Sequence, residues 1–223
     1  MRPPKLSPAP ARVAVLVSGS GTNLQALLDA LGPAGPARVV HVISTRPDAG
    51  ALERARAAGV PTTVLSDARD AVELLAALRD ADLAVLAGYL QRIPPAVVAR
   101  FRLRLINIHP ALLPAFGGPG MYGRRVHEAV LASGAAISGA TVHYVDEEYD
   151  RGPIIAQWPV PVRAGDTPES LAARVLEVEH RLLPRVVLEL VRRGLPEVPV
   201  RLLAVGSTFV AGDQLGVDFE QGS

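Results

Sequence analysis

The sequence predicts an α/β fold in which a doubly wound, mostly parallel sheet ends in antiparallel strands. Between residues 12 and 102, short apolar runs alternate with stretches of helical period. This alternation is typical of right-handed strand–helix–strand crossovers, which build a parallel sheet. After residue 136, two apolar runs instead lie on either side of an acidic turn, which indicates an antiparallel pair.

The N-terminal half is expected to contain four strands with helices between them. Residues 12–18 are apolar almost throughout, as is typical of a parallel strand buried on both faces. Pro94 is expected to start a helix, because the first turn does not use its missing N–H. Strands are expected at 12–18, 39–44, 61–65 and 83–87, and helices at 24–31, 49–58, 68–81 and from 94. The apolar residues that predict the buried face of the 68–81 helix are Val72, Leu75, Ala76 and Leu78.

A strand at 103–108 leads into the residues at which chemistry is expected. Asn107 and His109 are two positions apart, so at strand spacing their side chains project to the same side. They lie at the carboxyl end of the strand, where open α/β sheets bind ligands. An amide beside a titratable imidazole suits a reaction that develops negative charge on oxygen and moves protons. The alternative is a strand end with a helix-capping Asn and a surface His.

The C-terminal half begins with a glycine-rich loop at 115–123 that is long enough to cover a site. A helix is expected at 125–133, and antiparallel strands at 137–145 and 154–162. The segment 166–169 predicts the start of a long helix that runs toward Val191 and is kinked or broken near Pro184. One or two short strands are expected after Leu195, before a poorly ordered glycine-rich end.

A second ligand-binding feature is the glycine-rich turn at 19–23, between the first strand and the first helix. Its backbone N–H groups and the positive end of the helix dipole favour an anion, and a small phosphate fits best. The turn lacks the third glycine of a dinucleotide fingerprint and the Gly-Lys-Ser/Thr of a Walker loop. The alternative is a plain tight turn with Thr22 or Asn23 as the helix cap.

Composition excludes several classes of protein. A formal net charge of +1 argues against a nucleic-acid or anionic-membrane surface. Without Cys there are no disulfides or thiolate metal sites. No apolar run approaches the roughly 20 residues of a membrane span, and residues 1–11 lack the apolar core of a signal peptide. We therefore expect a cytoplasmic protein with a disordered tail at 1–11, one domain at 12–195 and a C-terminal extension at 196–223.

Four segments, in their order and spacing, resemble the phosphoribosylglycinamide formyltransferases of purine biosynthesis. They are Ser18-Gly-Ser-Gly-Thr-Asn-Leu-Gln25, Ala87-Gly-Tyr89, Asn107-Ile-His-Pro-Ala-Leu-Leu-Pro114 and Asp150-Arg-Gly-Pro153. The resemblance runs from about Val13 to Val191. It implies a Rossmann-like formyltransferase fold, with a phosphate-binding half at 12–102 and a catalytic, folate-binding half at 103–195. It also implies small-molecule substrates, a monomer or homodimer, 10-formyltetrahydrofolate as co-substrate and no metal.

The resemblance also assigns roles to residues. The catalytic set would be Asn107, His109 and Asp150. The substrate phosphate and sugar would be held by Gly21, Thr22, Asn23 and Glu179. The folate site would be lined by Arg69, Leu90, Gln91, Arg92, Ile93 and Asn107. The bond between Leu113 and Pro114 is expected to be cis.

The chemistry of formyl transfer suits these groups. An amine that attacks a formyl carbon leaves negative charge on the former carbonyl oxygen, which Asn107 and a protonated His109 would stabilise. Asp150 would favour the imidazolium and pass the amine proton through water. If this carboxylate outweighs burial, the pKa of His109 lies above its ordinary value. His143 is expected to be structural or to lie next to the catalytic groups, and His41, His127 and His180 are expected to be structural or at the surface.

The sequence departs from the family pattern at two positions and leaves rival functions open. Gln91 replaces the usual arginine, with Arg92 one place later, and Leu176 stands where relatives often have a polar or cationic residue near the phosphate. A methionyl-tRNA formyltransferase or a formyltetrahydrofolate hydrolase would share the Asn-x-His-Pro core, but each is expected to carry a further domain. The non-enzyme alternative is a phosphate-ligand sensor.

Overall fold

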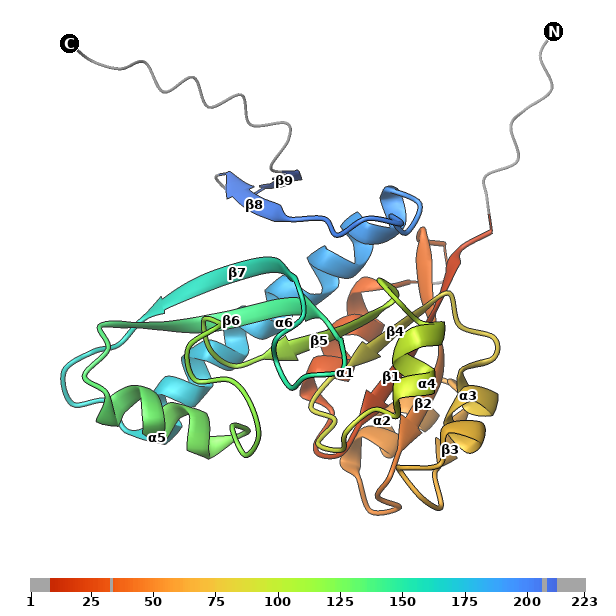
Figure 1. The fold of residues 1–223 in the computed structure, drawn as a ribbon, viewed down its shortest axis with the longest axis horizontal. Coiled ribbons are helices and arrows are strands. Elements are labelled where there is room, and N and C mark those ends of the chain that lie inside the picture. The colour runs from red at the N-terminus through yellow and green to blue at the C-terminus, as the bar shows by residue number, and fades with distance from the viewer. Residues whose placement is uncertain (1–8, 33, 206–207, 212–223) are drawn as a thin grey trace, which may run out of the picture.

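The computed structural model describes residues 9–32, 34–205 and 208–211. A seven-stranded sheet in the order β3-β2-β1-β4-β5-β6-β7 forms its centre (Figure 1). The first five strands pair in parallel, whereas β6 and β7 are antiparallel, so the expected fold class is confirmed. The strands are β1 Ala11–Val17, β2 Ala37–Ser44, β3 Thr62–Val64, β4 Leu83–Leu86, β5 Leu105–His109, β6 Ile137–Tyr144 and β7 Ile154–Pro161.

Helices cover both faces of the sheet because alternate strand residues point to opposite sides. In β1, Val13 and Val15 pack with one cluster of buried residues, whereas Ala14 and Leu16 pack with the other. The first cluster includes residues of α1, α2, α5 and α6, and the second includes residues of α3 and α4. The helices are α1 Thr22–Ala30, α2 Gly50–Ala57, α3 Ala71–Leu78, α4 Pro95–Arg100, α5 Arg124–Ala132 and α6 Pro168–Arg192.

Two expectations about the helices were wrong. The buried residues of α3 are Leu74 and Leu78, whereas Val72 is 77% exposed. Seven of the eight α3 residues are apolar, so the pattern alone does not select a face. A break near Pro184, one of the two alternatives expected for the long helix, is wrong: α6 is continuous and Pro184 is buried inside it. Apolar packing of Leu183 and Val186 on either side of the proline keeps this segment helical.

The observed starts of α6 and α4 agree better with the starts expected from the sequence. Thr167 caps α6, and its side chain accepts a hydrogen bond from Ser170 N while Ser170 Oγ accepts one from Thr167 N. For α4, Pro94 is the cap and Pro95 is the first helical residue, one position later than expected. The cis bond between Leu113 and Pro114 is confirmed.

The chain after α6 ends its described part in a separate hairpin. Strands β8 Leu202–Val205 and β9 Thr208–Ala211 pair antiparallel, as expected for the region after residue 195. The tail was expected at residues 1–11, but Ala11 already belongs to β1, so its expected end was wrong. Residues 1–8 of this tail and the glycine-rich end at 212–223 lie outside the described residues. None of the described helices is long and apolar enough to cross a membrane.

Candidate active site

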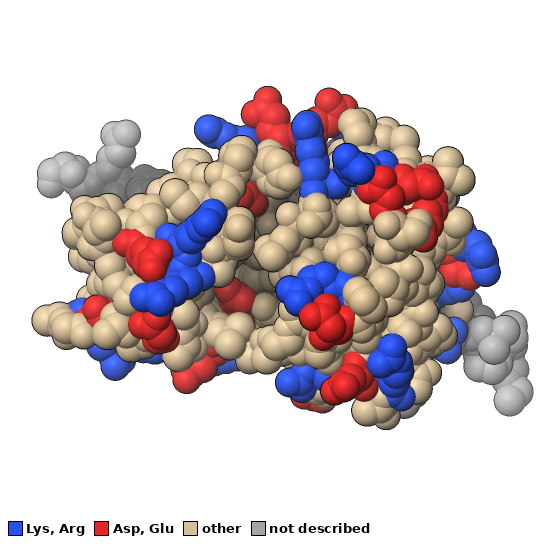
Figure 2. All heavy atoms as spheres, turned by 90° about the horizontal axis from the view of Figure 1, so that it is seen from below, with Lys and Arg blue, Asp and Glu red and all other residues tan. Residues whose placement is uncertain are grey.

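A cavity of about 610 Å³ lies at the carboxyl edge of the parallel strands. Seen from this side, the molecule has a hollow near its centre, with acidic atoms inside and basic side chains at the rim (Figure 2). The cavity is lined by the ends of β4 and β5, the loop after β4, the glycine-rich loop before α5, the acidic turn after β6, and the first half of α6. The sheet therefore brings together segments that are distant in the sequence.

Asn107 and His109 both line this cavity, as their spacing on β5 predicts. The Nδ2 atom of Asn107 lies 3.1 Å from Nε2 of His143, which faces it from the neighbouring strand β6. His109 is 3% exposed, and its Nε2 lies 2.8 Å from the carbonyl oxygen of Phe116. Because a carbonyl only accepts, this nitrogen of His109 must carry a proton and donate it.

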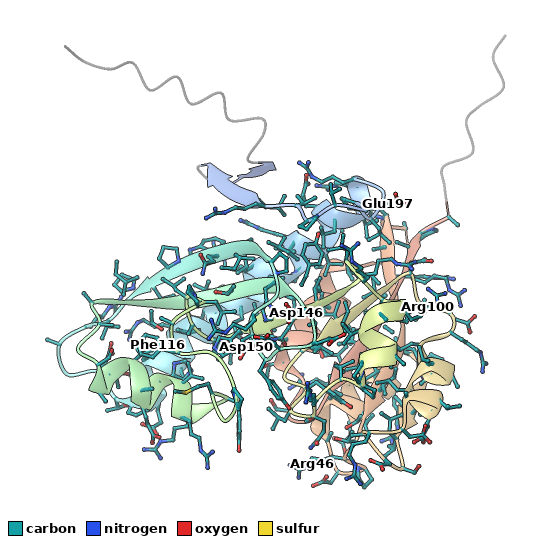
Figure 3. All side chains as sticks on the ribbon, viewed as in Figure 1. Arg46, Arg100, Phe116, Asp146, Asp150 and Glu197 are labelled. Atoms are coloured by element: carbon teal, nitrogen blue, oxygen red, sulfur yellow. The ribbon has the colours of Figure 1, made fainter. Side chains whose placement is uncertain are left out.

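Asp150 lies beside both histidines, although it is 41 residues after His109 in the sequence. Its Oδ2 is 3.6 Å from Nδ1 of His109, and its Oδ1 is 3.5 Å from Nε2 of His143. The backbone N–H of Gly118 donates to Oδ2 at 2.9 Å. In Figure 3 Asp150 lies where the two halves of the molecule meet. The expected proximity of Asp150 to His109 is therefore present.

Burial has the largest effect on the pKa values of His109 and Asp150. Burial lowers the pKa of His109 below 6.5, although the charge of Asp150 and the hydrogen bond to Phe116 act in the opposite direction. The carboxylate therefore does not outweigh burial, and the condition under which the pKa of His109 would lie above its ordinary value is not met. Burial opposes ionisation of Asp150, but its hydrogen bond with His143, the charge of a protonated His109 and the Gly118 N–H together lower the pKa of Asp150. Since His109 is neutral in the ligand-free site, the contribution of its charge is absent there, whereas the N–H of Gly118 donates to the carboxylate in either state of His109.

The glycine-rich turn reaches the same cavity through Ser20 and Asn23. Gly21 is the cap of α1 in a left-handed conformation with φ 76°, so neither Thr22 nor Asn23 caps the helix. A Cβ on Gly21 would lie 2.5 Å from Cβ of Ala51 in α2, so glycine is required there by packing as well as by φ. Thr22 does not line this cavity and instead lines a groove between α1 and α6.

Glu179 faces the turn from α6. It is 7% exposed, and its Oε2 accepts a hydrogen bond of 2.6 Å from Asn23 Nδ2. Burial raises the pKa of Glu179 to about 7, and the bond from Asn23 only partly offsets this. The Oδ1 atom of Asn23 is buried and has no partner among the described residues. Asn23 Oδ1 is therefore an acceptor that no described residue uses, at the end of the cavity next to the glycine-rich turn.

The loop after β4 lines the opposite part of the cavity with Leu90, Gln91, Arg92 and Ile93. Nη2 of Arg92 donates to the carbonyl oxygen of Glu147 at 3.0 Å, which ties this loop to the acidic turn. Arg69 is not brought here: its side chain is 88% exposed, and it pairs with Asp67 through Nε at 3.1 Å.

Two histidines that were not assigned to the catalytic set belong to this region. His143 contacts Asn107 and Asp150, which agrees with the expectation that it lies next to the catalytic groups. His127, expected to be structural or at the surface, is buried and lines the cavity. Burial lowers the pKa of His127, and the charge of His109 lowers it further when that ring is protonated. Its position in α5, directly after the glycine-rich loop, is the one sequence signal for this placement.

No group of three or more His, Asp or Glu side chains within the described residues is placed to hold a metal ion.

The carboxyl edge of this doubly wound sheet carries an amide, an imidazole and a carboxylate. Such a site is typical of group-transfer enzymes that stabilise an oxyanion and move a proton. The chain belongs to the formyl transferase family, whose sequence model matches residues 11–187.

Relatives and solved structures agree with this membership. A phosphoribosylglycinamide formyltransferase of Mycobacterium tuberculosis is 46% identical over 198 residues, covering 85% of this chain and 89% of the relative. A chloroplastic enzyme of that name from Arabidopsis thaliana is 47% identical, covering 79% of this chain and 64% of the relative, so the chain spans less than two thirds of it. The structure of glycinamide ribonucleotide transformylase 1 from Symbiobacterium toebii is 38% identical with a TM-score of 0.77, covering 94% of this chain and 98% of that one.

Proposed function

We propose that this protein transfers the formyl group of 10-formyltetrahydrofolate to the amine of phosphoribosylglycinamide, in the de novo synthesis of IMP. One observation carries the proposal: a single cavity joins the Asn107, His109 and Asp150 group to the glycine-rich turn on one side and to the loop at 90–93 on the other. A phosphorylated acceptor and a folate donor can therefore meet at the catalytic group. The formyl-donor folate is what membership of the family implies.

Asn107 supplies the oxyanion stabilisation in this proposal. Its Nδ2 carries two hydrogens, and the contact with His143 uses one of them. The other is available in the cavity to the oxygen of the formyl group, which becomes negative as the amine attacks the carbon. Donors fixed in advance at such an oxygen contribute strongly to catalysis, because they need no reorganisation during the reaction.

His109 acts as the base in this proposal and not as a charged donor at the start of the reaction. Its Nε2–H is held by the Phe116 carbonyl, so the lone pair of the neutral ring is on Nδ1, 3.6 Å from Asp150. As the C–N bond forms, Nδ1 takes a proton from the amine, directly or through water, and Asp150 stabilises the resulting imidazolium. The proton then passes to the folate nitrogen as its bond to the formyl carbon breaks.

The remaining site residues bind the substrates. The backbone of Gly21, Thr22 and Asn23 holds the phosphate, and Glu179 accepts from the sugar hydroxyls. The folate lies against Leu90, Gln91, Arg92 and Ile93, and Asn107 also contacts it. Leu176 lines the cavity without adding charge, so backbone donors carry most of the phosphate binding.

The proposal assigns the catalytic domain to residues 12–195, with phosphate-binding and folate-binding halves that meet at residue 102. Pairing of β4 with β5 continues the sheet across this boundary, so the halves share one core. We place the enzyme in the cytoplasm, as a monomer or homodimer that acts on small molecules.

A competition assay tests the function. The purified protein is given 10-formyltetrahydrofolate labelled in the formyl group, with phosphoribosylglycinamide, methionyl-tRNA and water as possible acceptors. We expect label in formylglycinamide ribonucleotide alone. Label in tRNA or in formate would favour the transferase or hydrolase alternatives, and binding of the phosphorylated compound without transfer would favour a sensor.

A further inference from the structure

The glycine-rich turn is held from the side of α2 by its carbonyl groups. Gly19 O accepts from the N–H of Ala51 at 3.1 Å, and Ser20 O accepts from Nε of Arg54 at 2.9 Å. Gly21 O accepts from Gln25 N at 2.9 Å, within the start of α1. The carbonyls of residues 19, 20 and 21 are therefore all engaged by the protein.

The N–H groups of the same turn are left for a ligand. None of the N–H groups of residues 19–23 donates a hydrogen bond to another residue that the structure describes. In a trans peptide the C=O and N–H point in opposite directions. The Ser20 carbonyl shares its peptide group with the Gly21 N–H, so a bond from Arg54 to the carbonyl directs this N–H away from α2.

The bond from Arg54 also strengthens the donor that it directs. A cation that donates to a carbonyl polarises the peptide group, and the N–H of that group becomes a better donor. Nη1 of Arg54 donates to Oε1 of Gln25 at 3.2 Å, which fixes the guanidinium behind the turn. The positive charge thus lies on the carbonyl side of the peptide group whose N–H belongs to Gly21.

Other cations at the cavity are engaged elsewhere. Arg92 donates to Glu147 O on the folate side. Arg124 pairs through Nε with Glu128 at 2.8 Å and with Glu169 at 3.2 Å. No other Arg or Lys is among the described residues that line the cavity. A dianionic phosphate at the turn therefore depends on charge supplied from outside the cavity wall.

We propose that Arg54 is a positioning residue for the substrate phosphate: from behind the turn it holds the Ser20 carbonyl, orients and polarises the Gly21 N–H, and supplies the positive charge that the cavity wall lacks. This role rests on the proposed function, which places the phosphate at the turn. It does not involve contact between Arg54 and the phosphate.

Binding of ribose 5-phosphate to the full-length protein tests this role. Arg54→Met should raise the Kd of ribose 5-phosphate by about tenfold or more, the loss typical of one hydrogen bond to a charged group. Arg54→Lys, which keeps the charge, should recover part of the affinity. The matched control is Arg56→Met, since Arg56 is an exposed arginine two positions later on α2.

Kinetics and spectroscopy separate positioning from a general loss of structure. In Arg54→Met, the KM for phosphoribosylglycinamide should rise while the folate KM and kcat stay within about twofold, because the lost binding is equal in the ground state and the transition state. The amide proton resonance of Gly21 in the ligand-free protein should move upfield in Arg54→Met and stay in place in Arg56→Met, since only the former removes polarisation of that peptide.

Several outcomes would overturn the role. They are an equal rise in both KM values, an unchanged Kd for ribose 5-phosphate in Arg54→Met, or the same loss in Arg56→Met. A wild-type protein that binds ribose 5-phosphate with an affinity that falls in Arg54→Met, but that transfers no formyl group, would refute the proposed function and leave the role of Arg54 standing. A wild-type protein that does not bind ribose 5-phosphate would refute this role.

Discussion

At the scale of single residues, burial and not the neighbouring carboxylate sets the starting state of His109. The ring is 3% exposed, and desolvation outweighs the attraction of Asp150 at 3.6 Å. A neutral imidazole whose tautomer is fixed by a backbone carbonyl is suited to accept a proton. Asp150 then stabilises the charge only after the proton has arrived.

Removal of the Asp150 charge should therefore affect catalysis more than binding. We expect Asp150→Asn to lower kcat by at least about 100-fold, as is typical for loss of an acid–base group, with little change in either KM. Burial already lowers the pKa of His109, and Asp150 raises it, so the substitution should lower it further. The acid limb of the pH–rate profile, below pH 6.5 in the wild type, should shift to still lower pH.

A double-mutant cycle checks whether the two residues act together. His109→Asn should be as damaging as Asp150→Asn, and the double variant should be no worse than the poorer single variant, because residues that act as one unit are not additive. Multiplicative losses in kcat would show that the two side chains act independently and would refute the assigned pair.

Two arginines provide a matched test of the folate side. Arg92 lines the cavity and holds the acidic turn through Glu147, whereas Arg69 is exposed and paired locally. Arg92→Met should raise the folate KM by about fivefold or more, since a charged hydrogen bond that orders the site is lost. Arg69→Met should leave the folate KM unchanged. A larger effect of Arg69→Met would place the folate outside the cavity described above.

At the scale of elements, the turn between β1 and α1 contains two glycines with different requirements. Gly21 needs a positive φ and meets Ala51, whereas a Cβ on Gly19 would have no atom within 4 Å. Gly21→Ala should lower the free energy of unfolding by more than about 1 kcal/mol, through backbone strain and overlap with α2. Gly19→Ala should keep the stability and raise the KM for phosphoribosylglycinamide only, because its methyl group would extend into open space at the turn to which the proposed function assigns the phosphate.

Thermal unfolding and steady-state kinetics of both variants provide the measurement. A fall in stability for Gly19→Ala, or an equal rise in the folate KM, would contradict the assignment of the turn to phosphate.

The elements that the sequence predicted well are those with a local signal. Apolar strands, the Thr167 cap and the spacing of Asn107 and His109 depend on neighbours within a few residues, so their patterns were sufficient. The buried face of α3 was not predictable, because almost every position in it is apolar. The pKa of His109 and the place of His127 depend on burial by the glycine-rich loop and by α5, which only the folded chain defines.

At the scale of the whole molecule, Glu179 links the site to the pH dependence of stability. Burial raises its folded-state pKa from 4.5 to about 7. Between these pH values the folded protein holds a proton that the unfolded chain has lost, so stability falls as the pH rises through this window. The contribution lost is on the order of 3 kcal/mol for a shift of this size.

Glu179→Gln keeps the acceptor for Asn23 and removes the titration. The Tm of the variant should therefore fall less between pH 5 and about 8 than the Tm of the wild type. Comparison of the two proteins cancels the histidines, whose lowered pKa values give a contribution of opposite sign. Glu177→Gln, at an exposed position of the same helix, is the control. Parallel pH profiles for wild type and Glu179→Gln would show that Glu179 does not titrate in this range.

The central claim is that this cavity moves a formyl group onto the amine of phosphoribosylglycinamide through Asn107, His109 and Asp150. The most direct measurement is a single-turnover reaction with formyl-labelled 10-formyltetrahydrofolate and phosphoribosylglycinamide, for the wild type and for His109→Asn. We expect the label to pass to the amine in the wild type and to slow by at least about 100-fold in the variant. No transfer by the wild type, or transfer at an undiminished rate by His109→Asn, would contradict the claim.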